Sequence, residues 1–153
     1  MKNNEILTSL GNIKKVPKGL KLVEKMGFKN VLNFGCGYGY KYHTEQMKEL
    51  NLINYDLYIP ELAILPSKDT KIDIVVCNNV LNVIEDDAVV LTVLETLESY
   101  NKPILITIYE GDKSGTGKIT SKKTYQRNLK SKDYTILKER DYKFKNGVWT
   151  KGV

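Results

Sequence analysis

The stretch VLNFGCGYGY, residues 31–40, constrains the fold of this chain more than any other part of it. An apolar run is followed at once by glycines at three alternate positions, Gly35, Gly37 and Gly39. A strand that ends in glycines needs positive φ angles there, or needs its backbone to come close to another group. The sequence therefore predicts a strand that breaks at Gly35 and leads into a helix through a turn of bare backbone.

Strand-like and helical segments alternate as far as residue 111. Helices are predicted over residues 18–27, 40–50 and 86–99, and strands over residues 29–37, 52–56, 72–77 and 103–111. Residues 57–71 contain two prolines and are predicted to be mostly loop. Strands that alternate with helices predict an α/β fold with a mostly parallel sheet.

The last third of the chain has a different character. Residues 111–133 are rich in Gly, Ser, Thr and Lys and are predicted to be a loop. Residues 134–152 are predicted to form two strands joined at Asn146-Gly147, a favourable hairpin turn. We expect one domain over residues 1–153, with its core at 18–111 and a basic loop and C-terminal antiparallel hairpin at 112–153.

Length and composition indicate a soluble, cytoplasmic protein. The chain has 153 residues, of which 41% are hydrophobic and 27% charged, as in globular proteins that bury a core. No apolar run approaches the roughly 20 residues that a membrane-spanning helix needs. The N-terminal stretch lacks the continuous apolar core of a secretory signal, so none is expected.

The few cysteines and histidines limit the chemistry. Cys36 and Cys77 both lie in apolar segments, which is typical of reduced thiols, and nothing beside Cys36 favours a depressed thiol pKa. The single histidine, His43, is predicted on a helix surface. Without a Cys/His cluster no metal site is expected.

The net charge of +6 is unevenly placed along the chain. Residues 1–110 contain 12 Lys and Arg against 14 Asp and Glu, a net charge of −2, whereas residues 111–153 contain 12 against 4, a net charge of +8. Such asymmetry attracts a polyanion or an anionic substrate, although a lysine-rich solvated surface has the same composition. Both interpretations stay open.

The glycine turn predicts a nucleoside ligand. In an open parallel sheet, ligands bind beyond the carboxyl ends of the strands, near the switch point beside the first strand. The spacing G-x-G-x-G is one residue tighter than the dinucleotide motif G-x-G-x-x-G. Asp56 ends the second predicted strand, where a carboxylate can accept hydrogen bonds from both ribose hydroxyls. Together, the three glycines and Asp56 favour an adenosine-type ligand.

The sequence VLNFGCGYG resembles the first motif of the class I S-adenosylmethionine-dependent methyltransferases, an apolar strand with an acid before G-x-G-x-G. The resemblance spans roughly residues 18–111. Asp56 matches the acidic ribose-binding residue, and DIVVCNNVLNVI, residues 73–84, is similar to the fourth-strand motif in small methyltransferase-like domains of phages, plasmids and DNA-modification islands. A Rossmann-like class I methyltransferase fold, with S-adenosylmethionine as cofactor, is what the resemblance implies.

The same resemblance implies the site residues. Cofactor contacts are expected from Asn33, Gly35, Cys36, Gly37, Gly39, Asp56, Leu57 and Asn78, and acceptor contacts from Asn79, Tyr109 and Tyr125. Asn33 stands where the first motif of the family has an acidic residue. An asparagine keeps a hydrogen-bond acceptor at this position but lacks the negative charge. Only 16 residues separate Asp56 from Asp73, too few for a helix and a full third strand. A trimmed sheet of six or seven strands is therefore expected.

The basic segment 113–151 is the expected contact for nucleic acid. Its GTGK is not a phosphate loop, because Asp112 replaces the first glycine and Ile119 follows the lysine. Its lysines, with Tyr125 and Arg127, are expected either to contact a phosphate backbone and a stacked base or to form a solvated loop. No proline follows the fourth-strand motif, which disfavours standard DNA-base methylation.

The leading hypothesis is methyl transfer from S-adenosylmethionine to an acceptor that is a nucleic acid or a small molecule. One alternative is a non-catalytic nucleic-acid-binding module on a degenerate methyltransferase fold, which Asn33 and the missing helix favour. Another is a mobile-element protein that cleaves S-adenosylmethionine. The sequence defines neither the acceptor nor the oligomeric state.

Overall fold

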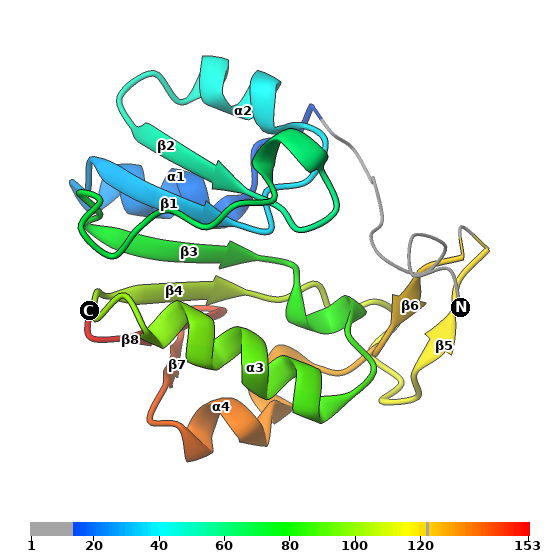
Figure 1. Cartoon of the computed structure of the whole chain (residues 1–153). Coiled ribbons are helices and arrows are strands. Elements are labelled where there is room, and N and C mark those ends of the chain that lie inside the picture. Colours follow the sequence, from blue (N-terminus) through cyan, green and yellow to red (C-terminus); the bar gives the residue numbers. More distant parts are fainter. Residues whose placement is uncertain (1–13, 122) are drawn as a thin grey trace.

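The computed structural model describes residues 14–121 and 123–153 (Figure 1). Their main sheet has six strands in the order β2-β1-β3-β4-β8-β7. The parallel strands are β1 (Asn30–Phe34), β2 (Asn51–Tyr55), β3 (Ile74–Asn78) and β4 (Ile104–Thr107); β8 (Val148–Lys151) is antiparallel to β4, and β7 (Lys143–Lys145) to β8. The predicted α/β fold, a mostly parallel sheet with a C-terminal antiparallel hairpin, is confirmed.

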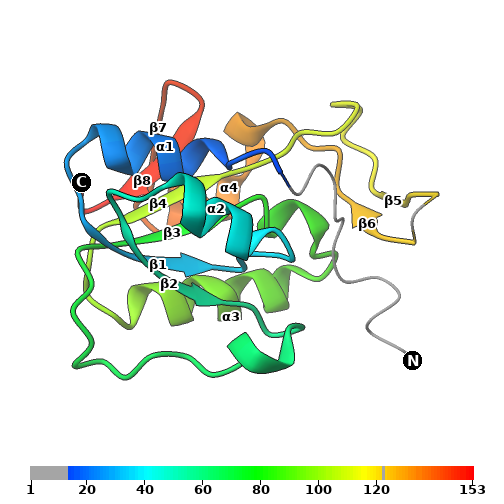
Figure 2. The ribbon, with the colours of Figure 1, turned by 90° about the horizontal axis from the view of Figure 1, so that it is seen from above.

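Helices cover both faces of this sheet (Figure 2). Helices α1 (Lys18–Lys25) and α2 (Tyr40–Gln46) lie on one face, and α3 (Asp87–Glu98) and α4 (Thr135–Glu139) on the other. Strands β3 and β4 are buried along their whole length, which explains why they read as continuous apolar runs. The described residues contain no helix with the length and apolarity needed to cross a bilayer.

The first two helices differ in detail from expectation. Leu20 and Val23 of α1 are buried, but Met26 is 44% exposed because the helix ends at Lys25 and Gly27 follows with φ +91°. Helix α2 ends at Gln46, earlier than predicted. His43 was expected on its surface and is instead 4% exposed, because α2 turns this side toward the apolar layer that contains Met47.

The stretch after β2 is as short as predicted. Residues 57–71 contain one 3₁₀ turn, Pro60–Leu62, and no strand. Strand β2 is therefore an edge of the sheet, and in the described residues no further strand lies beyond it.

The region after β4 contains more regular structure than predicted. Within 111–133, β5 (Lys118–Ile119) and β6 (Tyr125–Gln126) form a separate two-stranded sheet, which stands beyond the carboxyl ends of the parallel strands (Figure 1). Arg127 fixes it: its Nε donates to the Ile84 carbonyl at 2.6 Å, and its Nη2 to Asp87 Oδ1 at 2.8 Å. The Arg127 side chain is therefore committed to holding this loop.

The prediction of a strand directly after Tyr134 was wrong. Residues 135–139 form α4, which buries Leu137 completely. The β-branched Thr135 and Ile136 favour a strand locally, but packing of the helix on the core overrides that preference. The hairpin turn itself is confirmed, since Asn146 and Gly147 have φ angles of +52° and +81°.

A charged network ties α4 to the end of α3. Glu98 Oε2 accepts hydrogen bonds from Arg140 Nε and from Tyr142 Oη, both at 3.0 Å, and Lys151 Nζ lies 3.8 Å away. Burial by itself raises the pKa of Glu98, but the hydrogen bonds from Arg140 and Tyr142 and the charge of Lys151 outweigh burial and lower it. The ionised carboxylate therefore stabilises the junction between α3, α4 and β8.

Candidate functional site

The sheet has its switch point at β1, which pairs with β2 on one side and β3 on the other. The connections from β1 to β2 and from β3 to β4 leave the sheet in opposite directions, so a crevice is expected at the carboxyl ends of β1 and β3. The glycine turn follows β1 at this edge. Asp56 follows β2 here, and Asn78 ends β3. The fold thus brings together the strand ends from which the candidate residues were chosen.

Two of the three glycines need their special backbone conformation. Gly35 and Gly37 have φ angles of +74° and +75°, whereas Gly39 has φ −83° and is the residue before α2. Of the two reasons expected for a glycine, Gly39 lacks the positive φ, and the close approach of another group to its backbone stays a prediction.

The two positive-φ glycines leave different amounts of room. A Cβ added at Gly35 would lie 2.4 Å from Val80 Cγ2, so this glycine is needed for the turn to pack against the segment after β3. A Cβ added at Gly37 would have no atom within 4 Å. The backbone at Gly37 therefore borders open space, as expected of a turn that a ligand approaches closely.

Asp56 holds the glycine turn from the end of β2. Its Oδ2 accepts from the Gly37 N–H at 2.8 Å and its Oδ1 from the Tyr58 N–H at 3.0 Å. The N–H groups of Gly35 and Cys36 donate to the Tyr55 carbonyl, at 2.7 and 3.0 Å. The turn after β1 and the end of β2 thus form one hydrogen-bonded unit, in which each oxygen of the Asp56 carboxylate retains acceptor capacity.

Asn78 joins three elements at the same edge. Its Oδ1 accepts from the Gly19 N–H of α1 at 3.0 Å and from Thr107 Oγ1 of β4 at 2.9 Å. Within the described part of the chain, its Nδ2 is buried without a hydrogen-bond partner. Asn79 is exposed in a left-handed conformation with φ +57°. Asn78 therefore has a structural function on one side of its amide and an unsatisfied donor on the other.

The remaining expected cofactor residues differ in accessibility. Asn33 is buried, and its Nδ2 donates to Asn54 Oδ1 at 3.0 Å, so this amide links β1 to β2. Leu57 is 59% exposed directly after Asp56. Burial, and secondarily the charge of Asp56, raises the pKa of Cys36 to about 12, so its thiol is neutral at physiological pH.

The expected acceptor residues are not brought into mutual contact. Tyr109 follows β4, and its N–H donates to Asn82 Oδ1 at 3.4 Å. The Tyr125 hydroxyl instead packs over Gly117, where an added Cβ would lie 1.7 Å from it. Among residues 14–121 and 123–153, no hydrogen bond or ring contact joins Asn79, Tyr109 and Tyr125 to one another.

Two residues of the site were missed in the sequence. Thr107 donates to Asn78, and Gly19 leaves room for the Asn78 amide, because an added Cβ would lie 2.2 Å from Asn78 Oδ1. The signal for Gly19 was available: a glycine inside an amphipathic helix usually has a packing reason. Thr107 gives no local signal, since its role depends on the pairing of β3 with β4.

No family model and no curated protein matches the sequence. Among solved structures, the chain is similar to the plantazolicin methyltransferase BpumL in complex with SAH, with a TM-score of 0.43 and 19% identity over 67% of this chain and 48% of that chain. BpumL in complex with a triazolic desmethylPZN analog and SAH gives a TM-score of 0.49 and 17% identity, over 86% of this chain and 65% of that chain. The chain thus spans less than two thirds of the length of these structures. At this low sequence identity the similarity is one of fold.

Proposed function

We propose that this chain binds S-adenosylmethionine at the carboxyl ends of β1 and β2 and transfers its methyl group to an acceptor. The observation that carries the proposal is the turn at Gly37. Its backbone has a positive φ, borders open space, and is held by the Asp56 carboxylate at the switch point of the sheet. Gly27 also has a positive φ and open surroundings, so the features that distinguish Gly37 are its hydrogen bond to Asp56 and its position at the switch point of the sheet.

The residues at this edge fit an adenosine ligand. The turn at Gly35 and Gly37 gives the methionine part a close approach to the backbone. The remaining lone pairs of Asp56 suit the ribose hydroxyls, and the exposed Leu57 offers apolar surface to the adenine ring.

When bound, S-adenosylmethionine supplies a methyl group that the sulfonium already activates, so the protein has mainly to orient the acceptor. For this role we propose the exposed amide of Asn79, the residue after β3. The neutral Cys36 thiol does not serve as a nucleophile. No side chain at this edge is assigned as a general base.

The test is calorimetric titration of S-adenosylmethionine and S-adenosylhomocysteine into the wild type and into two matched variants. Gly37→Ala adds a methyl group to the open space that borders the turn. Gly27→Ala is its control, because Gly27 also has a positive φ, +91°, with no atom within 4 Å of an added Cβ, but lies at the far end of α1. Both variants carry the same left-handed strain, about 1 to 2 kcal/mol. We expect only Gly37→Ala to lose affinity, by about tenfold or more.

Equal binding by the two glycine variants would contradict a cofactor at this turn. A second variant, Asp56→Asn, keeps the shape of the side chain and removes its charge, and we expect it to weaken binding as well. If the wild type does not bind either ligand at millimolar concentration, the proposed function is wrong. Turnover of S-adenosylmethionine without any acceptor would identify cleavage in place of transfer.

A further inference from the structure

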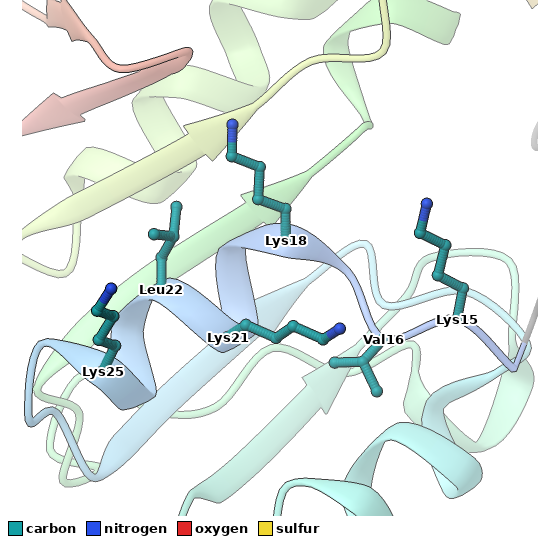
Figure 3. Close-up of a pocket in the computed structure, with 6 residues that line it drawn as sticks. All are labelled: Lys15, Val16, Lys18, Lys21, Leu22 and Lys25. Carbon is teal, nitrogen blue, oxygen red and sulfur yellow. The ribbon is translucent and has the colours of Figure 1, made fainter.

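Helix α1 carries a row of lysines on its outer side. Lys18, Lys21 and Lys25, with Lys15 just before the helix, are spaced by three or four residues and lie opposite the buried side of the helix. These four side chains line one hollow together with the aliphatic Val16 and Leu22 (Figure 3). We call the four residues the α1 lysine surface.

The charge of this surface is not neutralised by neighbours. Each of the four lysines is exposed, and in the described ranges 14–121 and 123–153 none has a carboxylate within 4 Å. No acidic side chain lines the hollow. Four ammonium groups around an aliphatic floor create a positive potential that an anion can occupy without displacing an internal ion pair.

Lys18 connects this surface to a second hollow that contains aromatic rings. That hollow includes Tyr109, Lys113, Phe144 and Gly147. A Cβ added at Gly147 would lie 3.0 Å from Lys18 Nζ, so the ammonium group lies against the turn between β7 and β8. Tyr109 is 59% exposed and Phe144 38% exposed, so both rings offer surface to a ligand.

Glu110 is the one acidic residue that lines the second hollow, and its carboxylate makes contacts within the protein. Glu110 Oε2 accepts from the Ser131 N–H at 2.6 Å, and its Oε1 lies 3.8 Å from Lys113 Nζ. The second hollow therefore combines the cation of Lys18 with the exposed Tyr109 and with Phe144, whose ring packs against Trp149 at a centroid distance of 5.0 Å.

Both hollows reach the edge of the sheet that holds the candidate site. Helix α1 begins beside Asn78, at the carboxyl end of β3, and Tyr109 follows β4 at the same edge. A chain-like ligand that lies along α1 and over Tyr109 would thus end beside the strand ends at which the glycine turn also lies.

We propose that the α1 lysine surface and the Tyr109 hollow together bind single-stranded nucleic acid. The lysines contact successive phosphates, and a base stacks on the Tyr109 ring. An acidic peptide or an anionic membrane would match the charge, but neither needs planar rings next to the cations. The last step rests on the proposed methyl transfer: the bound nucleic acid is the acceptor of the methyl group.

Several of the basic residues predicted for this role, in segment 113–151, make ion pairs within the protein. Lys113 pairs with Glu110 at 3.8 Å, and Lys118 with Asp112 at 3.3 Å. Arg127 holds the loop to Asp87. The expected nucleic-acid contact in segment 113–151 stays a prediction, and we propose the main electrostatic contact at α1.

The test measures fluorescence anisotropy of labelled oligouridine and oligothymidine with the full chain, without S-adenosylmethionine, over a range of salt concentrations. The variant Lys18→Ala/Lys21→Ala/Lys25→Ala removes three charges from the surface. The control, Lys48→Ala/Lys102→Ala/Lys138→Ala, removes three exposed charges that line neither hollow. With about 0.7 counterions released per phosphate contact, we expect the salt slope to fall by about 2 in the surface variant only.

A second pair of variants tests the stacking. Tyr109→Ala is expected to weaken binding by roughly tenfold at all salt concentrations, whereas Tyr109→Phe keeps the ring and the affinity. A preference for one oligonucleotide identifies RNA or DNA as the natural ligand. The inference is overturned if the surface and control variants bind alike, or if vesicles of phosphatidylserine bind more tightly than either oligonucleotide. Oligonucleotide binding by a chain that does not bind S-adenosylmethionine would refute only the proposed methyl transfer.

Discussion

The contact between Gly35 and Val80 makes a sharp prediction about the glycine turn. In Gly35→Ala, the new Cβ would lie 2.4 Å from Val80 Cγ2 on a backbone with φ +74°. Val80 cannot turn away freely, because branching at Cβ restricts its χ1 angle. The substitution therefore adds a steric overlap to a left-handed conformation that alanine disfavours.

The two costs can be separated. The left-handed conformation costs about 1 to 2 kcal/mol for a residue with a Cβ. The overlap adds about 1 to 3 kcal/mol, as insertion of a methyl group into packed surroundings usually does. Gly35→Ala should thus lower the free energy of unfolding by about 2 to 5 kcal/mol, and Gly37→Ala, which meets no atom, by only about 1 to 2 kcal/mol.

The assay is urea unfolding of the wild type, Gly35→Ala, Val80→Ala and the double variant, followed by circular dichroism. Val80→Ala removes the overlapping methyl group, so the double variant should be more stable than the sum of the single effects predicts, by about 1 to 2 kcal/mol. A coupling energy near zero, or equal destabilisation by Gly35→Ala and Gly37→Ala, would refute the packing argument.

Three further predictions concern the rest of the fold. Folding lowers the pKa of Glu98, so the stabilising effect of this carboxylate is complete above its unfolded pKa and is lost as the pH falls through its folded pKa. Glu98→Gln should therefore unfold more easily than the wild type at pH 7. The difference in melting temperature between the two proteins should disappear at acid pH. Burial raises the pKa of Cys36 and of Cys77 to about 12, so both thiols should react slowly with a disulfide reagent at pH 8 until denaturant is added; rapid reaction of the native protein would contradict this. Arg127→Ala should make the loop 112–128 more sensitive to trypsin while the far-ultraviolet circular dichroism stays the same, and an unchanged cleavage rate would show that the Arg127 contacts do not restrain the loop.

The features that sequence could predict are those with a local cause. The glycine turn and Asp56 were predicted to lie together because both follow strands, and the carboxyl ends of parallel strands share an edge. The Asn146-Gly147 turn was predictable because both residues accept positive φ. In each case a few adjacent residues define the backbone.

The features that sequence missed depend on contacts between distant segments. Residues 135–139 form a helix because Leu137 is buried by packing, although the β-branched residues before it favour a strand. Counting charges correctly located the excess of basic residues in the last third of the chain. Counting could not show that Arg127 is committed to internal contacts, or that Lys18 would lie against the turn between β7 and β8.

The position of β8 has a consequence for how the protein is made. This strand lies between β4 and β7, and its Trp149 is fully buried in the same core as residues of β4. A ribosome synthesises β4 long before β8, so a growing chain presents the apolar outer edge of β4 without its partner. The sheet closes only when residues 148–151 have emerged. Until then the outer edge of β4 is open to pairing with another chain.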